Sequence, residues 1–316
     1  MSNKLNVTVS PHIRSVNSTT GIMLDVVIAL IPALIAGIYF FGPRALYITA
    51  VCVLTCVLGE LSFQLICKRA VTIHDLSAVV TGMLLAFNLP VSIPEWQAIV
   101  GSLVAIVVVK QLFGGIGYNF ANPAIAARVM MLLSFSTTMT NWPLAKSVDD
   151  ALVSEATPLA IIKGTGEGEL PSLFHMMIGE RAGCIGETCA IAIFIGFMYL
   201  LFRKVITWHT PVVFVGGVFL LSFFALDFSV RDALYQVLSG GLLIGAVFMA
   251  TDYTTTPPTP FGKVVFALGC AVITVAVRLW GSNPEGVSFA ILFMNILTPY
   301  ISRMTKRKVF GGRKVK

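Results

Sequence analysis

Residues 82–90 read GMLLAFNLP and residues 245–253 read GAVFMATDY; each is an apolar run that begins at a glycine and ends in polar or proline-containing sequence. The second run begins 163 positions after the first. Each is followed by a break, VSIPE at 91–95 or TTTPPTP at 254–260, and then by another long apolar run. This matched order suggests that the chain contains the same structural unit twice.

A second pair of breaks has nearly the same spacing. GYNFANPA at 117–124 and GSNPEGVS at 281–288 begin 164 positions apart. A local proline or glycine kink explains any single break, but two separate features that share one offset favour an internal repeat. Each half holds five apolar runs, an odd number, so the second half is predicted to be inverted relative to the first. Inverted repeats with interrupted helices are typical of transporters whose sites lie near the membrane midplane.

The composition places these runs in a membrane. The chain has 316 residues, of which 56% are hydrophobic and only 12% charged, and its mean hydropathy is +0.87. Soluble domains carry about 25% charged residues, and a spanning helix needs about 20 mostly apolar ones. We therefore predict an all-α membrane protein of about ten transmembrane helices in two inverted five-helix repeats. The predicted segments are 21–41, 45–66, 76–90, 96–113, 123–136, 186–202, 210–226, 233–250, 263–280 and 286–302, of which 76–90 and 123–136 are short for a straight span.

Charge sets the predicted orientation. The last fourteen positions hold seven basic residues and no acidic one, which indicates a cytoplasmic tail rather than nucleic-acid binding. Ten spans then place the N-terminus inside as well. The loop at 137–183, with three basic and six acidic residues, falls outside. The first apolar run is too long for a signal-peptide core, and we predict that it is a mature helix. The predicted organisation is a cytoplasmic segment (1–20), repeat 1 (21–136), the outer loop (137–183), repeat 2 (184–302) and a cytoplasmic tail (303–316).

Five ionisable residues lie in or beside apolar runs: Asp25, Glu60, Lys110, Arg128 and Asp252. A charge in hydrocarbon is costly, so each is a functional candidate. The alternative is that each lies near a cytoplasmic helix end, where its charge reaches water easily. Asp25, about five residues into the first helix with no basic neighbour in sequence, and Asp252, in the second repeat, are our candidates for an ion path.

The cysteines do not indicate a metal site. Cys52 and Cys56 share a helix face, but no histidine or carboxylate accompanies them at ligand spacing. Packing is the expected role, since buried cysteine behaves as a small hydrophobe. The sequence contains neither a nucleotide-binding glycine fingerprint nor a nucleophile–histidine–acid arrangement, so we predict no catalytic residues of the soluble-enzyme kind.

The outer loop contains SEATPLA at 154–160. Together with TGMLLAFNLP (81–90), GGIGYNFANPA (114–124) and GAVFMATDYTTTPPTP (245–260), in this order, it resembles the D subunits of Rnf ion-translocating electron-transport complexes, the RnfD family. It is more distantly similar to NqrB of the sodium-pumping NADH:quinone reductases. The resemblance spans nearly the whole chain and implies a urea-channel-like fold.

The resemblance implies a covalent flavin. In the family a Ser/Thr-Gly-Ala-Thr motif carries FMN, joined through its phosphate to the last threonine. That residue is Thr157 here, preceded by Ser154 and Ala156, whereas Glu155 replaces the usual glycine. A hydroxyl that a flavin transferase must reach fits an aqueous loop, and the following proline limits local freedom. A noncovalent riboflavin is a further expectation, by analogy with NqrB.

The resemblance also implies partners and a reaction. The chain would relay electrons in ferredoxin:NAD oxidoreduction coupled to Na⁺ or H⁺ export across the bacterial inner membrane. Its partners would be the lipid bilayer and other Rnf subunits, including a second FMN-bearing one. Two alternatives remain open: a solute channel or transporter of the same fold, and a scaffold subunit without a cofactor.

Overall fold

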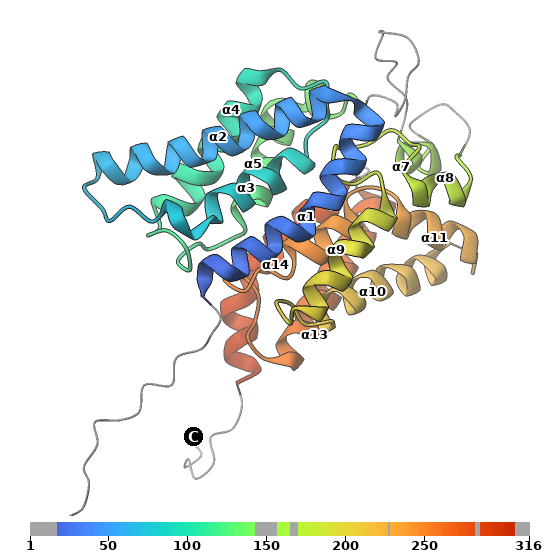
Figure 1. Cartoon of the computed structure of the whole chain (residues 1–316). Helices are drawn as coiled ribbons and strands as arrows, with labels where there is room; N and C mark the ends of the chain where they lie inside the picture. Colours follow the sequence, from blue (N-terminus) through green and yellow to red (C-terminus); the bar gives the residue numbers. More distant parts are fainter. Residues whose placement is uncertain (1–17, 143–156, 165–169, 227, 282–284, 307–316) are drawn as a thin grey trace, which may run out of the picture.

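The computed structural model describes residues 18–142, 157–164, 170–226, 228–281 and 285–306, and the secondary structure of these residues is entirely helical (Figure 1). The helices of the first half are α1 (Thr19–Phe41), α2 (Pro43–Ile66), the 3₁₀ turn η1 (Ile73–Asp75), α3 (Ser77–Phe87), α4 (Glu95–Leu103), the π-helix η2 (Val104–Gln111) and α5 (Pro123–Ser134). The connection contains α6 (Ser136–Met139), α7 (Pro158–Ile162) and α8 (Leu173–Ile178). The second half contains α9 (Ala190–Phe202), α10 (His209–Ala225), α11 (Val230–Leu238), α12 (Leu242–Ile244), the π-helix η3 (Gly245–Met249), α13 (Pro260–Trp280) and α14 (Val287–Met304).

Each of the ten predicted apolar runs corresponds to helix. By length and composition, α1, α2, α13 and α14 can span a membrane, and a fifth span results if α11 and the α12–η3 segment, bent by 66°, count as one. The α3 and α5 helices have 11 and 12 residues, which confirms that both are short for a span. The all-α membrane class is therefore confirmed, whereas the count of ten spans and the inverted relation of the halves stay predictions.

Local sequence explains where the long helices begin and end. The Ser18 hydroxyl accepts a hydrogen bond from the Gly21 N–H at 3.1 Å and caps α1. Gly42, with φ +74°, ends α1 in a conformation that disfavours other residues, and Pro43 begins α2, where its missing N–H costs nothing. Asn122 and Thr259 cap α5 and α13 in the same way, each just before a proline.

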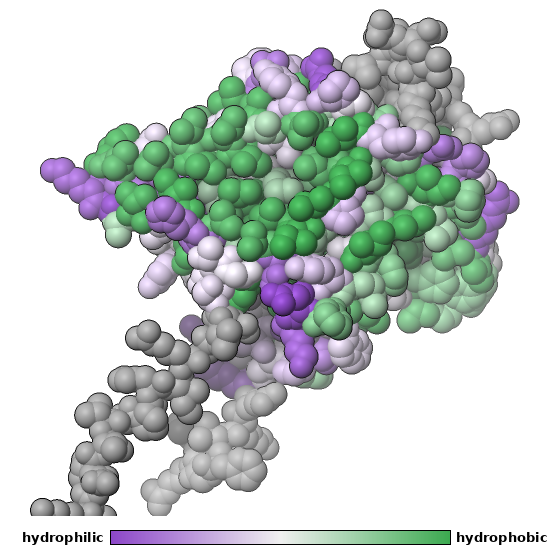
Figure 2. Space-filling view, in the orientation of Figure 1, coloured by the Kyte–Doolittle hydropathy of each residue, from purple (hydrophilic) through white to green (hydrophobic). Residues whose placement is uncertain are grey.

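The outer surface of the molecule is apolar. Figure 2 shows hydrophobic residues over most of the visible face and hydrophilic ones gathered toward its edges. Large side chains such as Tyr39, Leu54, Leu65 and Phe194 are at least 60% exposed. Contiguous apolar patches of this extent are rare on soluble monomers, so this surface faces lipid.

The two halves pack along one seam. The α1 helix lies against α9, and α5 lies against α14. At the first contact, a Cβ on Gly196 would lie 2.3 Å from the Ala29 carbonyl oxygen, so only glycine allows this approach. Close contact through small residues is the usual way that membrane helices associate.

The two predicted breaks meet at this seam. The Asn88 side-chain amide donates to the Met249 sulfur at 3.6 Å, and the Asn122 amide donates to the Met249 carbonyl at 3.4 Å. Backbone N–H groups of Ile185 and Gly186 donate to the carbonyls of Leu89 and Phe87 at 3.2 and 3.0 Å. Irregular backbone at membrane depth needs such partners, and these contacts place the first break beside the end of η3, just before the second break.

Candidate functional site

Thr157 begins the short helix α7. Its hydroxyl oxygen accepts a hydrogen bond from the Ala160 N–H at 3.3 Å. The side chain is only 6% exposed, so Thr157 is not the freely exposed loop hydroxyl that the sequence suggested. Of the other predicted flavin-site residues, Ser154 and Ala156 lie outside the described residues, as does Glu155.

The α7 segment is anchored to the second half of the molecule. Leu159 is buried, and its Cδ1 lies 2.8 Å from the point where a Cβ on Gly240 would stand. Gly240 has φ +63°, so glycine meets both the conformational and the spatial demand. The Lys163 ammonium donates to the Gly281 carbonyl just after α13. Thr157 is therefore held beside the bend between α11 and α12.

A group of buried charged residues lies at the same bend; we call Arg128, Arg181, Arg278, Glu187 and Glu285 the arginine cluster. All three arginines and Glu187 are at least 96% buried. The cluster lies close to the place where α7 is anchored, since the Arg278 guanidinium lies 3.3 Å from the same Gly240 Cβ position that Leu159 approaches.

Two of the arginines donate hydrogen bonds to the carbonyl groups at the end of α11. Arg181 donates to the carbonyls of Leu238 and, at 2.6 Å, Glu187. Arg278 donates to the Gln236 carbonyl and, at 3.0 Å, to that of Ser239. The last carbonyls of a helix lack partners within it and form its negative end. The two guanidiniums therefore stabilise the C-terminus of α11 inside the protein.

The third arginine joins the two halves. The Arg128 guanidinium on α5 pairs with the Glu285 carboxylate before α14 and donates to the Asn88 side-chain oxygen at the first break. It also lies 3.7 Å from the Cys184 sulfur, which donates to the Asn88 carbonyl at 3.3 Å. One side chain thus contacts both repeats and the segment that precedes α9.

Several polar atoms of this region lack partners. Among the described residues, nine buried side-chain nitrogen or oxygen atoms form no hydrogen bond, and five belong to Arg181, Glu187, Thr188, Ser239 and Arg278. Buried groups of this kind are usually satisfied by ordered water. We therefore interpret the region around the cluster as a charged, hydrated interior.

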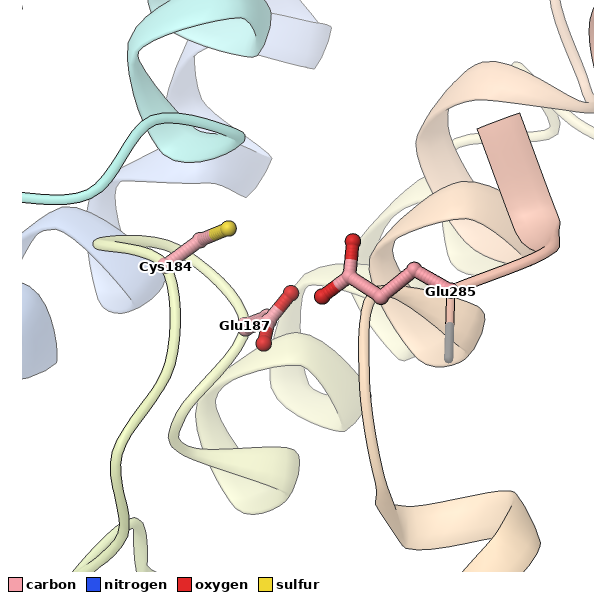
Figure 3. Close-up of side chains that lie close together, drawn as sticks. All are labelled: Cys184, Glu187 and Glu285. Carbon is pink, nitrogen blue, oxygen red and sulfur yellow. The ribbon is translucent and has the colours of Figure 1, made fainter. Parts of the chain in front are cut away.

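The side chains of Cys184, Glu187 and Glu285 point toward one another (Figure 3), and their ligand atoms lie within 4.8 Å. Electrostatics disfavours a metal ion at this place, since the cluster already has three guanidiniums against two carboxylates. Burial, reinforced by Glu187, raises the pKa of the Cys184 thiol well above its ordinary value, so the thiolate that a metal needs is not available.

The two ion-path candidates lie apart from the cluster. Asp25 pairs with Arg203 at 3.1 Å and accepts from the Tyr199 hydroxyl at 3.0 Å, so the fold supplies the cation absent from its sequence neighbourhood. Asp252 accepts hydrogen bonds from the Thr254 N–H and hydroxyl at 3.1 and 3.0 Å and from the Thr255 hydroxyl at 3.2 Å.

Glu60 and Lys110 form a buried pair at 2.8 Å, and Lys110 also contacts the Ser77 hydroxyl at 2.5 Å. Both charges therefore have a structural explanation in addition to any role in ion passage. The arginine cluster as a whole was missed by sequence reasoning. Two signals were available: Arg128, which the sequence already marked as a charge in an apolar run, and the second repeat break, GSNPEGVS, which contains Glu285.

Comparison with known proteins matches the whole chain. The model of the NQR2, RnfD, RnfE family matches residues 6–311. The D subunit of the Na(+)-translocating ferredoxin:NAD(+) oxidoreductase complex of Acetobacterium woodii is 45% identical over 318 residues, which cover 99% of this chain and 98% of the relative. Its counterpart in the proton-translocating ferredoxin:NAD(+) oxidoreductase complex of Clostridium ljungdahlii is 37% identical, with 99% and 98% covered. The D subunit of an ion-translocating oxidoreductase complex of Halorhodospira halophila is 34% identical, with 95% and 94% covered.

Proposed function

Because the chain belongs to the NQR2, RnfD, RnfE family, we propose that it is the D subunit of an Rnf-type complex in the bacterial inner membrane. This complex couples electron transfer between reduced ferredoxin and NAD to export of Na⁺ or H⁺. The relatives' names differ in the translocated ion, so overall similarity does not select between the two ions. The other partners are the remaining Rnf subunits, one of which carries a second FMN.

The subunit's part in this reaction is electron relay through FMN esterified to Thr157 by a flavin transferase. The observation that carries this proposal is the geometry of the Thr157 segment. An ester oxygen retains a lone pair, so it can still accept from the Ala160 N–H as the hydroxyl does now. Leu159 and the Arg278 guanidinium both approach Gly240, so a cation of the arginine cluster lies in the part of the fold that holds α7, and a guanidinium is a good partner for phosphate oxygens. The residues present therefore fit the group, but its attachment requires Thr157 to become accessible first.

Within this role the flavin supplies one-electron and two-electron redox chemistry, and the chain supplies its position. Thr157 provides the attachment point, while Lys163 and Leu159 hold α7 against the bend of the second half. Arg278 and Arg181 keep that bend rigid through the α11 carbonyls.

The test is a pair of matched hydroxyl variants in cells with an active flavin transferase. Thr157→Ala should give a denatured chain without ultraviolet fluorescence on a gel. Ser172→Ala removes an equivalent hydroxyl, which caps α8 by accepting from the His175 N–H at 3.3 Å, and should leave the fluorescent band unchanged. A fluorescent Thr157→Ala chain would show that the attachment site is wrong. A dark wild-type chain would favour the scaffold alternative.

The contacts between the two halves argue against the alternative that the chain is a solute channel. The contacts of Asn88 and Asn122 with Met249 and of Arg128 with Glu285 join the two halves across this seam. The cavity on this seam, lined in part by Lys110 and Asp252, has a volume of about 90 Å³. Small-molecule sites usually measure about 300–1,000 Å³, so the described residues do not fit a noncovalent riboflavin there either.

The same cavity supports a proposal for the ion. Asp252 is a carboxylate that lines this cavity between the two halves, together with Lys110 and several polar side chains, and interrupted helices commonly form coupling-ion sites. Asp25 has lower priority, since it is paired with a half-exposed arginine. Replacing Asp252 with Asn should reduce ion transport by the assembled complex while Asp25→Asn has the smaller effect. Equal transport in wild type and Asp252→Asn would exclude this path.

A further inference from the structure

A second polar cavity lies where α10 and α13 begin. Its volume is about 190 Å³, and its lining includes Thr207, Thr210, Tyr253 and Lys263 together with prolines of the TTTPPTP break. We call it the Lys263 pocket. None of the redox roles proposed above uses these residues, although the break was the most distinctive motif of the second half.

The pocket combines a cation with two helix starts. The first turns of α10 and α13 contribute Thr210 and Lys263 to its lining, and neither turn has an acidic residue, although Thr259 caps the start of α13. The α10 helix also has no side-chain cap, so its first N–H groups lack a side-chain acceptor. Lys263 lies in the first turn of α13, where a cation is unfavourable. Without a bound anion, the Lys263 ammonium and the positive ends of the helices repel one another.

The nearby polar groups do not neutralise Lys263. Its ammonium donates to the Thr207 hydroxyl at 3.0 Å, and it has no carboxylate partner among the described residues. Asp252 lies between the lining residues Thr251 and Tyr253, and its carboxylate accepts from Thr254 and Thr255 and forms no ion pair with Lys263 among the described residues. Other charges on the connection between α9 and α10, such as exposed Lys204, add further positive potential.

The pocket offers donors without acceptors. The Thr210 side chain is 98% buried, lines the pocket and forms no hydrogen bond in the described structure. The Thr207 hydroxyl accepts from Lys263, which leaves its proton free to donate. By contrast, the Thr251 and Thr256 hydroxyls already donate to the carbonyls of Val247 and Asp252, at 2.5 and 2.7 Å. An ammonium and two free hydroxyl donors beside two helix N-termini match an anion with several oxygens.

We propose that the Lys263 pocket binds a phosphate group. The position of the pocket is consistent with either a membrane phospholipid or a dissolved phosphate compound. The Thr259 hydroxyl donates to that of Thr305 at 2.9 Å, so the start of α13 lies beside the end of α14, after which the basic tail follows. This is the end of the molecule where anionic headgroups would lie if the tail is cytoplasmic. The pocket also adjoins the seam cavity through Val205 and Ile206, which provides an apolar surface for the rest of a ligand.

Two binding measurements on the detergent-purified full chain test the proposal. Inorganic phosphate is titrated and followed by phosphorus-31 NMR line broadening. Retention of phosphatidylglycerol and of phosphatidylcholine from mixed micelles is counted by native mass spectrometry. Lys263→Gln should weaken binding at least about tenfold, because it removes a charged donor, and Thr210→Val should weaken it at least about threefold. Lys306→Gln removes an exposed cation at the same end of the molecule and should leave binding within about twofold of wild type.

The outcomes separate the sources. Phosphate binding that depends on Lys263 and Thr210, without lipid retention, identifies a dissolved ligand. Lipid retention that depends on the same two residues, without binding of inorganic phosphate, identifies a lipid headgroup. If both phosphate binding and lipid retention depend on these residues, the pocket is a general phosphate site. Absence of binding in both measurements, or equal losses in Lys263→Gln and Lys306→Gln, would overturn the proposal. If Lys263→Gln does not fold, the isosteric Thr210→Val variant decides.

Discussion

The α13 helix carries a basic residue near each end, and the two environments are opposite in kind. Arg278 and Lys263 stand about 22 Å apart along this helix. At the C-terminal end of α13, which contains Arg278, guanidiniums face helix carbonyls and carboxylates inside the arginine cluster. At the other end, an ammonium faces a hydroxyl and two helix N-termini in the Lys263 pocket. A positively charged side chain can therefore stabilise an interrupted helix in one place and, in another, favour the binding of an external anion.

The two cations differ because of the helix end that each one faces, and not because of how deeply each is buried. Positive charge near a helix C-terminus is favourable, and near an N-terminus it is unfavourable. The arginines also satisfy carbonyls that the bend at α11 leaves without helical partners. Removal of a cation should therefore destabilise the first region and not the second.

The largest effect is expected from breaking the inter-repeat ion pair. Arg128→Met leaves the Glu285 carboxylate and the Asn88 oxygen without their partner, and should lower the free energy of unfolding by about 3–5 kcal/mol. Thermal unfolding in detergent, followed by a thiol-reactive dye, measures the loss. The double variant Arg128→Met/Glu285→Met should recover most of it, because no isolated charge remains. A double variant as unstable as the single one would show that the pair is not the source.

A smaller loss is expected at the end of α11. Arg278→Lys keeps the charge but cannot reach two carbonyls in a fixed fork, so it should lose about 1.5–3 kcal/mol of stability. Protease cleavage near the bend, compared with that of the wild-type chain, measures local opening. Full stability in the lysine variant would mean that charge alone, without bidentate geometry, caps this helix.

A weak and salt-sensitive effect is expected at the Asp25–Arg203 pair of the seam, in which Asp25 is buried and Arg203 is half exposed. Arg203 is 54% exposed, so Arg203→Ala should cause only a small drop in unfolding temperature that vanishes at high salt. Thermal unfolding at low and at high salt is the measurement. A large, salt-independent drop would show that the buried Asp25 carboxylate depends on Arg203. Asp25 would then again rank beside Asp252 as a candidate ion-path residue.

The smallest effect should have the opposite sign. In phosphate-free detergent, Lys263→Met removes an unfavourable cation from the first turn of α13 and should stabilise the chain by about 0.3–1 kcal/mol. The same thermal measurement applies, repeated with inorganic phosphate, where wild type should gain stability and the variant should not. A clear loss of stability without ligand would contradict the comparison between the two ends of α13.

Much of the architecture was accessible from sequence. Each of the ten predicted apolar runs corresponds to helix, and the first break, which the sequence located at 91–95, follows Asn88, whose amide contacts Met249 of the other half. The main departure lies before α9, which begins at Ala190 rather than at 186, because Ile185 and Gly186 satisfy the carbonyls of the first break. The Thr157 motif was also visible, but not its burial.

Sequence alone determined the membrane class and the resemblance to a family, because these depend on composition and on the order of motifs along the chain, whereas the repeat boundaries stay predictions. Tertiary structure decided which charges are matched. Arg128 and Glu285 are 157 positions apart, and the partners of Arg278 lie about 40 positions away. A charge is stabilising or not according to groups within a few ångströms, and only folding brings such distant groups together.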